Sequence, residues 1–206
     1  MAKSPYIGHL PPQFDYALLC DHLRAYRGKR EKISQMIEEG EIIRVKKGIY
    51  TLAPIYRRPY NPFAIANMLY GPSYVSMHSA LSHYRAIPEQ VAIVTSMNPK
   101  RPKKFKTPVG EFQYYFTPPD VYPAGIEICM FGETSVLMAT PEKALLDLLT
   151  HQKIDPAQVE KAIEGFRIDS DFLAGLDSGR LTMIADLYRH PLAAATLEYW
   201  RTHHGE

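Results

Sequence analysis

The spacing of apolar residues along the first fifty positions predicts two helices followed by a β-hairpin. In residues 14–26 and again in residues 29–39, apolar side chains recur every three or four positions, as on one face of a helix. Residues 41–45 and 49–52 are β-prone runs, and a basic turn with a glycine separates them. Helix, helix and hairpin in this order predict a winged-helix-like module, with only two helices before its wing.

Beyond residue 61 the pattern changes to a mixture of strands and helices. A threonine followed by a proline predicts a further helix that starts at residue 141. The predicted strands cover residues 91–96, 112–116, 126–130 and 135–138, and the other predicted helices cover residues 62–70, 78–86, 156–166, 169–176, 179–189 and 191–203.

Prolines mark the borders of these regions. They predict an extended arm over residues 1–12 and a linker over residues 53–61. The chain therefore divides into two predicted domains, residues 1–53 and residues 62–206, with C-terminal helices from about residue 156. The expected fold class is α+β: an N-terminal winged-helix-like domain followed by a mixed α+β domain with a helical C-terminal tail.

The composition excludes a membrane-embedded chain. Hydrophobic residues make up 46% of the sequence and charged residues 22%, and no apolar run approaches the roughly 18 residues of a membrane span. No apolar segment follows Lys3, so a secretory signal is not expected. Cys20 and Cys129 lie far apart in apolar stretches, which indicates buried thiols rather than a disulfide or a metal site. We expect a cytoplasmic protein without a membrane partner.

Charge is distributed unevenly along the chain. Residues 1–110 contain 17 Lys and Arg against 7 Asp and Glu, whereas residues 111–206 contain 7 against 15. A basic half joined to an acidic half suggests a nucleic-acid-binding face on the first half. An ordinary solvated surface is the alternative interpretation.

The basic charge is concentrated in the predicted helix and hairpin of residues 24–47. The first turn of the second helix offers N–H groups and cations to phosphate, and Ser34 and Gln35 lie off its apolar stripe, where a base edge is within reach. Lys46 and Lys47 at the hairpin tip are expected to contact phosphates. The predicted DNA-binding residues are Arg27, Lys29, Arg30, Lys32, Ser34, Gln35, Arg44, Lys46 and Lys47.

A second basic patch is predicted in the second domain, in a stretch expected to be a solvated loop or the tip of a β-ribbon. It consists of Lys100, Arg101, Lys103, Lys104 and Lys106. Three interpretations are open: a second phosphate-contacting element beside the wing, a surface that meets an acidic partner, or a solvated loop.

The residues that could support catalysis have simpler explanations. His78 and His83 are five positions apart and face different ways on one predicted helix. Glu142 occupies a first helical turn, where a carboxylate favours the helix dipole, and Lys143 and Asp147 form an i, i+4 pair. Neither a Gly-rich phosphate loop nor a Gly-x-Ser-x-Gly elbow occurs. We therefore expect no enzymatic activity, no catalytic residue, no cofactor and no metal.

Three segments together carry a family resemblance. They are Lys32-Ile33-x-x-Met36-Ile37-x-x-Gly40-Glu41-Ile42-Ile43-Arg44-Val45-Lys46-Lys47-Gly48-Ile49-Tyr50, Tyr74-Val75-Ser76-Met77-His78-Ser79-Ala80-Leu81 and Ala139-Thr140-Pro141-Glu142-Lys143-Ala144-Leu145-Leu146-Asp147. In this order and spacing, over roughly residues 14–150, the chain resembles the AbiEi-type antitoxins of abortive-infection (type IV) toxin–antitoxin systems.

The resemblance implies a transcriptional autorepressor that is also an antitoxin. Its N-terminal domain is expected to bind operator DNA, and the remainder to counteract a nucleotidyltransferase toxin encoded beside it. Paired operator half-sites would go with a homodimer. The alternative is a non-catalytic protein- or RNA-interaction module that uses the basic face, because Glu31, Glu38 and Glu39 on the second helix would repel DNA.

Overall fold

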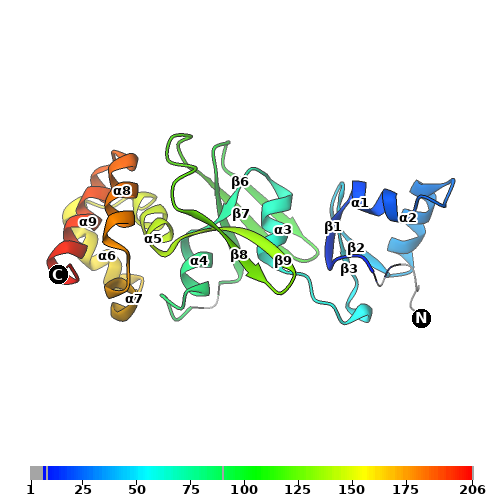
Figure 1. Ribbon diagram of the computed structural model, residues 1–206, viewed down its shortest axis with the longest axis horizontal. Coiled ribbons are helices and arrows are strands. Elements are labelled where there is room, and N and C mark those ends of the chain that lie inside the picture. Colours follow the sequence, from blue (N-terminus) through cyan, green and yellow to red (C-terminus); the bar gives the residue numbers. More distant parts are fainter. Residues whose placement is uncertain (1–6, 8, 90, 206) are drawn as a thin grey trace.

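The computed structural model describes residue 7, residues 9–89 and residues 91–205 of the 206-residue chain. Much of the arm predicted over residues 1–12 lies outside this part. The described chain forms three regions that follow one another along the long axis: a small N-terminal unit, a central sheet and a group of C-terminal helices (Figure 1). Within it, no helix has the length and apolar character to cross a membrane.

The N-terminal unit is a small antiparallel sheet with two helices on one face (Figure 1). The strand order is β1-β3-β2, so the first strand lies on the outer side of the hairpin's second strand. Its elements are β1 (Gln13–Asp15), α1 (Tyr16–His22), α2 (Lys29–Glu38), β2 (Ile42–Lys46), β3 (Ile49–Leu52) and the 3-10 turn η1 (Pro54–Tyr56).

The first predicted helix is shorter in the structure and begins later. Phe14 belongs to β1, where it pairs with Tyr50 and stacks on its ring with centroids 6.1 Å apart. Asp15 then caps α1, because its carboxylate accepts a hydrogen bond from the N–H of Leu18 at 2.8 Å. Leu18 is consequently exposed, although helical spacing alone had placed it on the apolar face.

The central region is a mixed sheet with strand order β6-β7-β5-β4-β9-β8. β4 pairs parallel with β9 and β5 pairs parallel with β7, whereas β4 with β5, β6 with β7 and β8 with β9 are antiparallel. Its elements are α3 (Pro62–Leu69), β4 (Tyr74–Val75), α4 (Met77–His83), β5 (Ile93–Asn98), β6 (Lys103–Thr107), β7 (Gly110–Phe116), β8 (Ile126–Phe131) and β9 (Thr134–Ala139).

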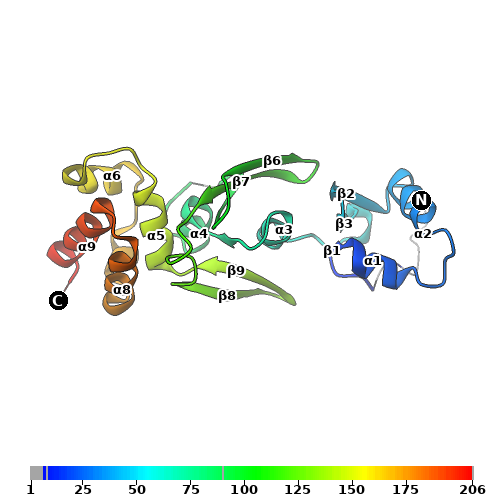
Figure 2. The same ribbon diagram turned by 90° about the horizontal axis from the view of Figure 1, so that it is seen from above.

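The hairpins β6–β7 and β8–β9 diverge towards the N-terminal unit, and α3 lies between them (Figure 2). The side chain of Asn67 on α3 replaces a missing strand neighbour there: it accepts from the N–H of Leu137 at 2.8 Å and donates to the carbonyl of Leu137 at 3.2 Å. The turns of both hairpins face the N-terminal unit (Figure 2).

The C-terminal helices share one large core with the sheet. Thr140 caps the predicted helix at residue 141, as expected from the sequence. The core includes Leu146 of that helix, Leu181 and Trp200. The helical elements are α5 (Pro141–Thr150), η2 (Pro156–Gln158), α6 (Val159–Gly165), α7 (Ser170–Ala174), α8 (Ser178–Tyr188) and α9 (Pro191–His203). The fold class is α+β.

The N-terminal unit has a small core of its own but is also docked on the central sheet. The small core runs from Ile7 to Tyr56, while Val45 and Ile49, on the other face of the hairpin, belong to the large core. Gln13 links the two sides: its amide donates to Thr134 Oγ1 at 3.2 Å, and its oxygen accepts from the N–H of Asn61 at 3.0 Å.

Candidate nucleic-acid interface

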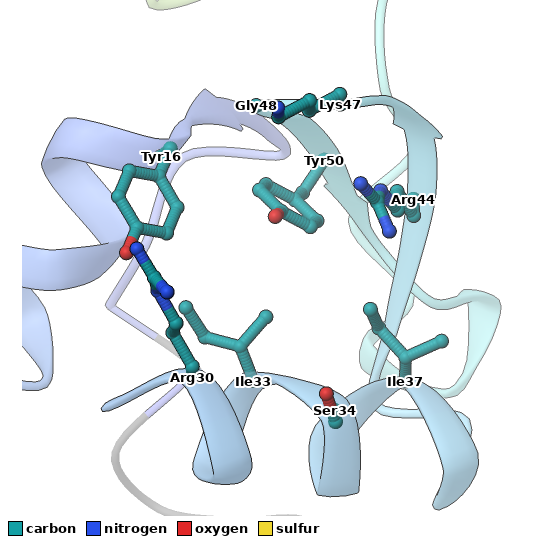
Figure 3. Close-up of a pocket in the computed structure, with 9 residues that line it drawn as sticks. All are labelled: Tyr16, Arg30, Ile33, Ser34, Ile37, Arg44, Lys47, Gly48 and Tyr50. Atoms are coloured by element: carbon teal, nitrogen blue, oxygen red, sulfur yellow. The ribbon is translucent and has the colours of Figure 1, made fainter. Parts of the chain in front are cut away.

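A groove of about 680 Å³ lies on the N-terminal unit between α2 and the β2–β3 hairpin (Figure 3). Side chains from α2 form one wall and side chains from the hairpin form the opposite one. Its lining residues are Tyr16, Arg30, Ile33, Ser34, Ile37, Arg44, Lys47, Gly48 and Tyr50.

The hairpin wall is held by its turn and by the start of α1. Gly48 has φ +87°, a conformation that favours glycine, and this allows a two-residue turn between Lys46 and Ile49. The N–H of Tyr16 donates to the carbonyl of Gly48 at 2.8 Å. The tip of the hairpin is thus tied to the first residue of α1.

The α2 wall follows from helical spacing. Arg30, Ile33, Ser34 and Ile37 are three and four positions apart, so they share one side of the helix. Ile33 and Ile37 point into the groove, and Arg30 points towards Tyr16 at the start of α1 (Figure 3). Ile33 is also buried in the small core, which fixes the rotation of α2. This rotation brings Arg30 and Ser34 to the groove.

The groove carries positive charge around a neutral aromatic floor. Arg30, Arg44 and Lys47 line it without a carboxylate among the lining residues, and none of these cations makes an ion pair within the described residues. Burial raises the pKa of the Tyr50 hydroxyl, and nearby Arg44 opposes this shift. The site therefore presents three cations without ion-pair partners in the described chain, beside the hydroxyl groups of Tyr16, Ser34 and Tyr50, which suits a polyanion.

Acidic and polar side chains occupy the outward side of α2 instead. Gln35 donates to Glu39 Oε1 at 2.7 Å and accepts from Lys32 Nζ at 3.2 Å. Gln35 and Lys32, both predicted to bind DNA, are thus engaged on their own helix and lie outside the groove. The reason is geometric: position 35 is about 100° further round the helix than position 34.

The N-terminus of α2 already has an anion beside it. Its N-cap is Gly28, and a Cβ added there would come within 2.9 Å of Glu31 Oε2. This carboxylate sits where a phosphate had been predicted. Arg27 and Lys29 flank this helix start but are not among the groove-lining residues.

Lys46 faces away from the groove, contrary to its predicted role at a free hairpin tip. The strand register shifts between Arg44 and Lys46, and this irregularity turns Lys46 towards the central sheet. Its ammonium donates to the carbonyl of Leu69 at 3.1 Å and lies 4.6 Å from the centre of the Phe105 ring. Lys46 therefore contributes to the junction between the two units. Of the two lysines at the hairpin tip, only Lys47 lines the groove.

The predicted second basic patch is partly a strand: Lys103, Lys104 and Lys106 lie on β6, which pairs along its length with β7, whereas Lys100 and Arg101 precede this strand. Lys103 lies over the rings of Tyr70 and Phe105 at 5.5 and 5.2 Å. Lys100 lies over Tyr70 at 5.5 Å and donates to the carbonyl of Gly71 at 2.5 Å.

The remaining cations of the patch do not join this cluster. By strand alternation Lys104 and Lys106 point to the opposite side of β6, and Lys106 pairs with Glu111 at 3.4 Å. The carbonyl of Arg101 accepts a hydrogen bond from the hydroxyl of Tyr70 at 3.3 Å. The five cations therefore do not form one continuous patch.

No protein family and no curated protein matches this sequence. A solved structure does. The crystal structure of the RV2827C protein from Mycobacterium tuberculosis aligns with a TM-score of 0.52 at 12% sequence identity, over 94% of this chain and 78% of that chain. Identity at this level supports a shared α+β fold and nothing about activity. The resemblance to AbiEi-type antitoxins stays a prediction.

The residues weighed for catalysis lie apart from the groove. His78 packs against Phe166 and His83 against Phe131, and burial lowers the pKa of both imidazoles. Among the described residues, no group of three or more His, Cys, Asp and Glu has the geometry of a metal site.

Sequence reasoning missed the two tyrosines of the groove. Tyr50 counted only as part of a β-prone run, and Tyr16 fell inside a helix that was predicted to start earlier. Tyr16 is 40% exposed at the first residue of α1. For Tyr50, an aromatic residue beside the basic hairpin turn Lys46-Lys47-Gly48 was the available signal, whereas the sequence around Tyr16 offers none.

Proposed function

We propose that this protein is a transcriptional autorepressor and antitoxin that binds operator DNA through its N-terminal unit. The observation that carries the DNA-binding part is the groove, which Arg30, Arg44 and Lys47 line without a carboxylate among the lining residues. Phosphate oxygens would contact these cations, and Ser34 on the groove wall would reach a base edge.

The N-terminal unit works in this proposal as an abbreviated winged helix. Its order β1-α1-α2-β2-β3, with β1 paired to β3, supports that view. DNA approaches from the groove side, because the outward side of α2 carries Glu31, Glu38 and Glu39. The phosphate contacts come from Arg30, Arg44 and Lys47 rather than from the helix N-terminus.

Lys46, Lys100 and Lys103 have a different role in the proposal. Two of their ammonium groups bind carbonyls at the end of α3, and all three lie over aromatic rings. Cations at a helix C-terminus are favourable. We therefore assign Lys46 to the junction and Lys100 and Lys103 to the end of α3, and we leave all three outside the DNA-binding surface.

The antitoxin part of the proposal rests on the family resemblance. We assign the neutralisation of a neighbouring nucleotidyltransferase toxin to residues 62–206, since this region retains an exposed surface when DNA occupies the groove. Most of this region is acidic: residues 111–206 contain 15 Asp and Glu and 7 Lys and Arg.

The decisive experiment measures binding to a duplex from upstream of the protein's own gene and to a random duplex of the same length. The wild type is expected to prefer the upstream duplex. Arg30→Ala with Arg44→Ala should weaken that binding roughly 30- to 150-fold, as expected for two lost contacts of about 1 to 1.5 kcal/mol each. A matched control, Arg167→Ala with Arg201→Ala, removes the same charge from the C-terminal region and should bind normally.

Equal affinity for both duplexes would remove the repressor proposal and favour the protein- or RNA-interaction module. The acidic outward side of α2 is the observation that keeps this second candidate open. Co-expression with the neighbouring toxin tests the other half: the groove variant should still protect cells. Loss of protection in that variant would show that the two roles have been assigned to the wrong regions.

A further inference from the structure

The two edges of the central sheet differ sharply in chemistry. β6 forms one edge and carries Lys103, Lys104 and Lys106, which hinder pairing with another strand. β8 forms the other edge and carries a single charged residue, Glu127, whose carboxylate accepts a hydrogen bond from the hydroxyl of Tyr84 at 2.8 Å. The β8 edge therefore lacks the charges that usually protect an open strand.

Apolar side chains line this unprotected edge. Ile128 is 66% exposed and Met130 is 62% exposed, the highest values among the exposed large hydrophobic side chains of the described residues. Leu137, which pairs with Ile128 across β8 and β9, is 39% exposed on the same face. On the inner face, Phe131 packs against Phe63 and His83, so only the outer face and the edge are bare.

We propose that β8 pairs antiparallel with β8 of a second copy of this chain, with Cys129 of one copy opposite Cys129 of the other. A twofold axis normal to the sheet preserves the two faces of each sheet. In this register Ile128 of each copy lies beside Met130 of the other, so the two most exposed apolar side chains meet twice.

The sequence around Cys129 makes the edge self-complementary. Ile128 and Met130 flank Cys129 symmetrically, and Glu127 falls opposite Phe131. A register centred on Glu127 would instead oppose two carboxylates, which is destabilising. Pairing β8 with the β6 edge of another copy would place three lysines, of which Lys106 already pairs with Glu111, against a strand whose one carboxylate is Glu127. The closed pairing of two β8 strands is thus favoured over open chains of molecules.

A dimer of this kind has a consequence for the groove. It would join the two central sheets at their β8 edges, and each N-terminal unit would keep its own groove free, because α2, which forms one wall of the groove, lies on the side of that unit away from the central sheet (Figure 1). The dimer does not rest on the proposed function. It is tested without DNA, so it can fail while DNA binding holds.

The first experiment is the molar mass by light scattering across a dilution series. The wild type should rise from the 23.5 kDa of one chain towards twice that mass as concentration increases. Met130→Lys and Ile128→Lys should both stay at one chain mass, since each places a charge on the edge. Met183→Lys, which changes a 49% exposed methionine on α8, is the matched control and should behave as the wild type.

The second experiment tests the register through the native thiol. Opposite residues in antiparallel strands have Cα atoms about 4.5 or 5.5 Å apart, and both distances suit a disulfide. Cys20→Ser treated with diamide should therefore form a covalent dimer through Cys129, and Cys20→Ser with Cys129→Ser should not. A wild type that stays monomeric, a Met130→Lys dimer, or a dimer without the Cys129 link would each overturn the proposal.

Discussion

Charged residues serve opposite purposes in the groove and in the main core. Lys143 and Asp147 on α5 are fully buried, with Nζ and Oδ1 3.7 Å apart. The carboxylate also accepts hydrogen bonds from Ser76 at 2.5 Å and from the hydroxyl of Tyr188. In the groove, the cations have no such partners. The core charges are neutralised by partners within the fold, whereas the groove cations can bind a ligand.

The buried pair connects three parts of the fold. α5 carries both charges, Ser76 follows β4, and Tyr188 ends α8. Lys143 also donates to the carbonyl of Val121 at 3.0 Å. The resemblance to a family includes this segment, yet its charges cannot reach a partner from a sealed position. They are best explained as a structural link between the sheet and the C-terminal helices.

The largest predicted effect comes from breaking this link. Asp147→Ala leaves the Lys143 ammonium buried without its counter-ion, and we expect a loss of about 3 to 5 kcal/mol in the free energy of unfolding. Urea denaturation measures it. Glu38→Ala, on the exposed side of α2, should change stability by less than about 0.5 kcal/mol.

A double variant separates the pair from its packing. Lys143→Met with Asp147→Leu removes both charges, keeps the volume similar and should recover most of the stability lost in Asp147→Ala. A loss below about 1 kcal/mol in Asp147→Ala would mean that water reaches the pair and that the contrast with the groove does not hold.

The next effect is a loss of stability at alkaline pH that originates in the core. Burial, and secondly the charge of Asp147, raises the pKa of Tyr74 and Tyr188 well above 10. Above pH 10 these tyrosines ionise in the unfolded chain but not in the folded protein, so each should reduce stability by about 1.4 kcal/mol per pH unit. Burial lowers the pKa of Lys143 in the folded protein. Below pH 10.5, the pKa of lysine in the unfolded chain, this shift makes stability rise with pH and so opposes the effect of the tyrosines.

Unfolding free energies at pH 9, 10, 11 and 11.5 would show this dependence, with tyrosinate absorbance as a parallel measurement. The free energy of unfolding should fall most steeply above pH 10.5, where Lys143 no longer opposes the effect of the tyrosines. Tyr188→Phe should reduce the slope by about 1.4 kcal/mol per pH unit. An unchanged slope in that variant would show that Tyr188 ionises freely in the folded protein.

Local patterns in the sequence were sufficient for most elements of this fold. Helical spacing, a threonine cap and β-prone runs predicted α2, α5 and the β2–β3 hairpin near their observed bounds. β1 and β4 were not predicted, because three and two residues are too short to show an alternating pattern. β6 was not predicted as a strand, because its lysines left a solvated loop and a ribbon tip equally open, and only its pairing with β7 decides between them.

The candidate site was predictable only in part, because side-chain direction depends on packing. Burial of Ile33 sets the rotation of α2, and this rotation puts Ser34 in the groove and Gln35 outside it. A one-residue irregularity in β2 sends Lys46 to the junction. Packing also decides the burial of Lys143 and Asp147. Their i, i+4 spacing is the same on an exposed and on a buried helix face, so the sequence did not predict a buried pair.

A smaller effect should distinguish Ser34 from Gln35. Ser34→Ala removes a groove hydroxyl and should weaken binding to the upstream duplex by about 1 kcal/mol, with little change for random DNA. Gln35→Ala should leave both affinities within about a factor of two, because Gln35 bonds to Glu39 on the outward side of α2. The reverse ranking would place the base-reading face on the outward side of the helix.

The smallest effect separates Lys47 from its neighbour Lys46. Lys47 lines the groove, so Lys47→Ala should reduce the slope of log K against log salt by about 0.9, the value for one lost phosphate contact. Lys46→Ala should leave this slope unchanged and cost about 0.5 to 1 kcal/mol of stability, because it loses the Leu69 carbonyl and the Phe105 ring. Binding titrations at several salt concentrations and melting curves of both variants supply the two measurements. If both lysines change the salt slope equally, the DNA-binding surface extends across the hairpin to the junction, and charge there is available to a ligand as it is in the groove.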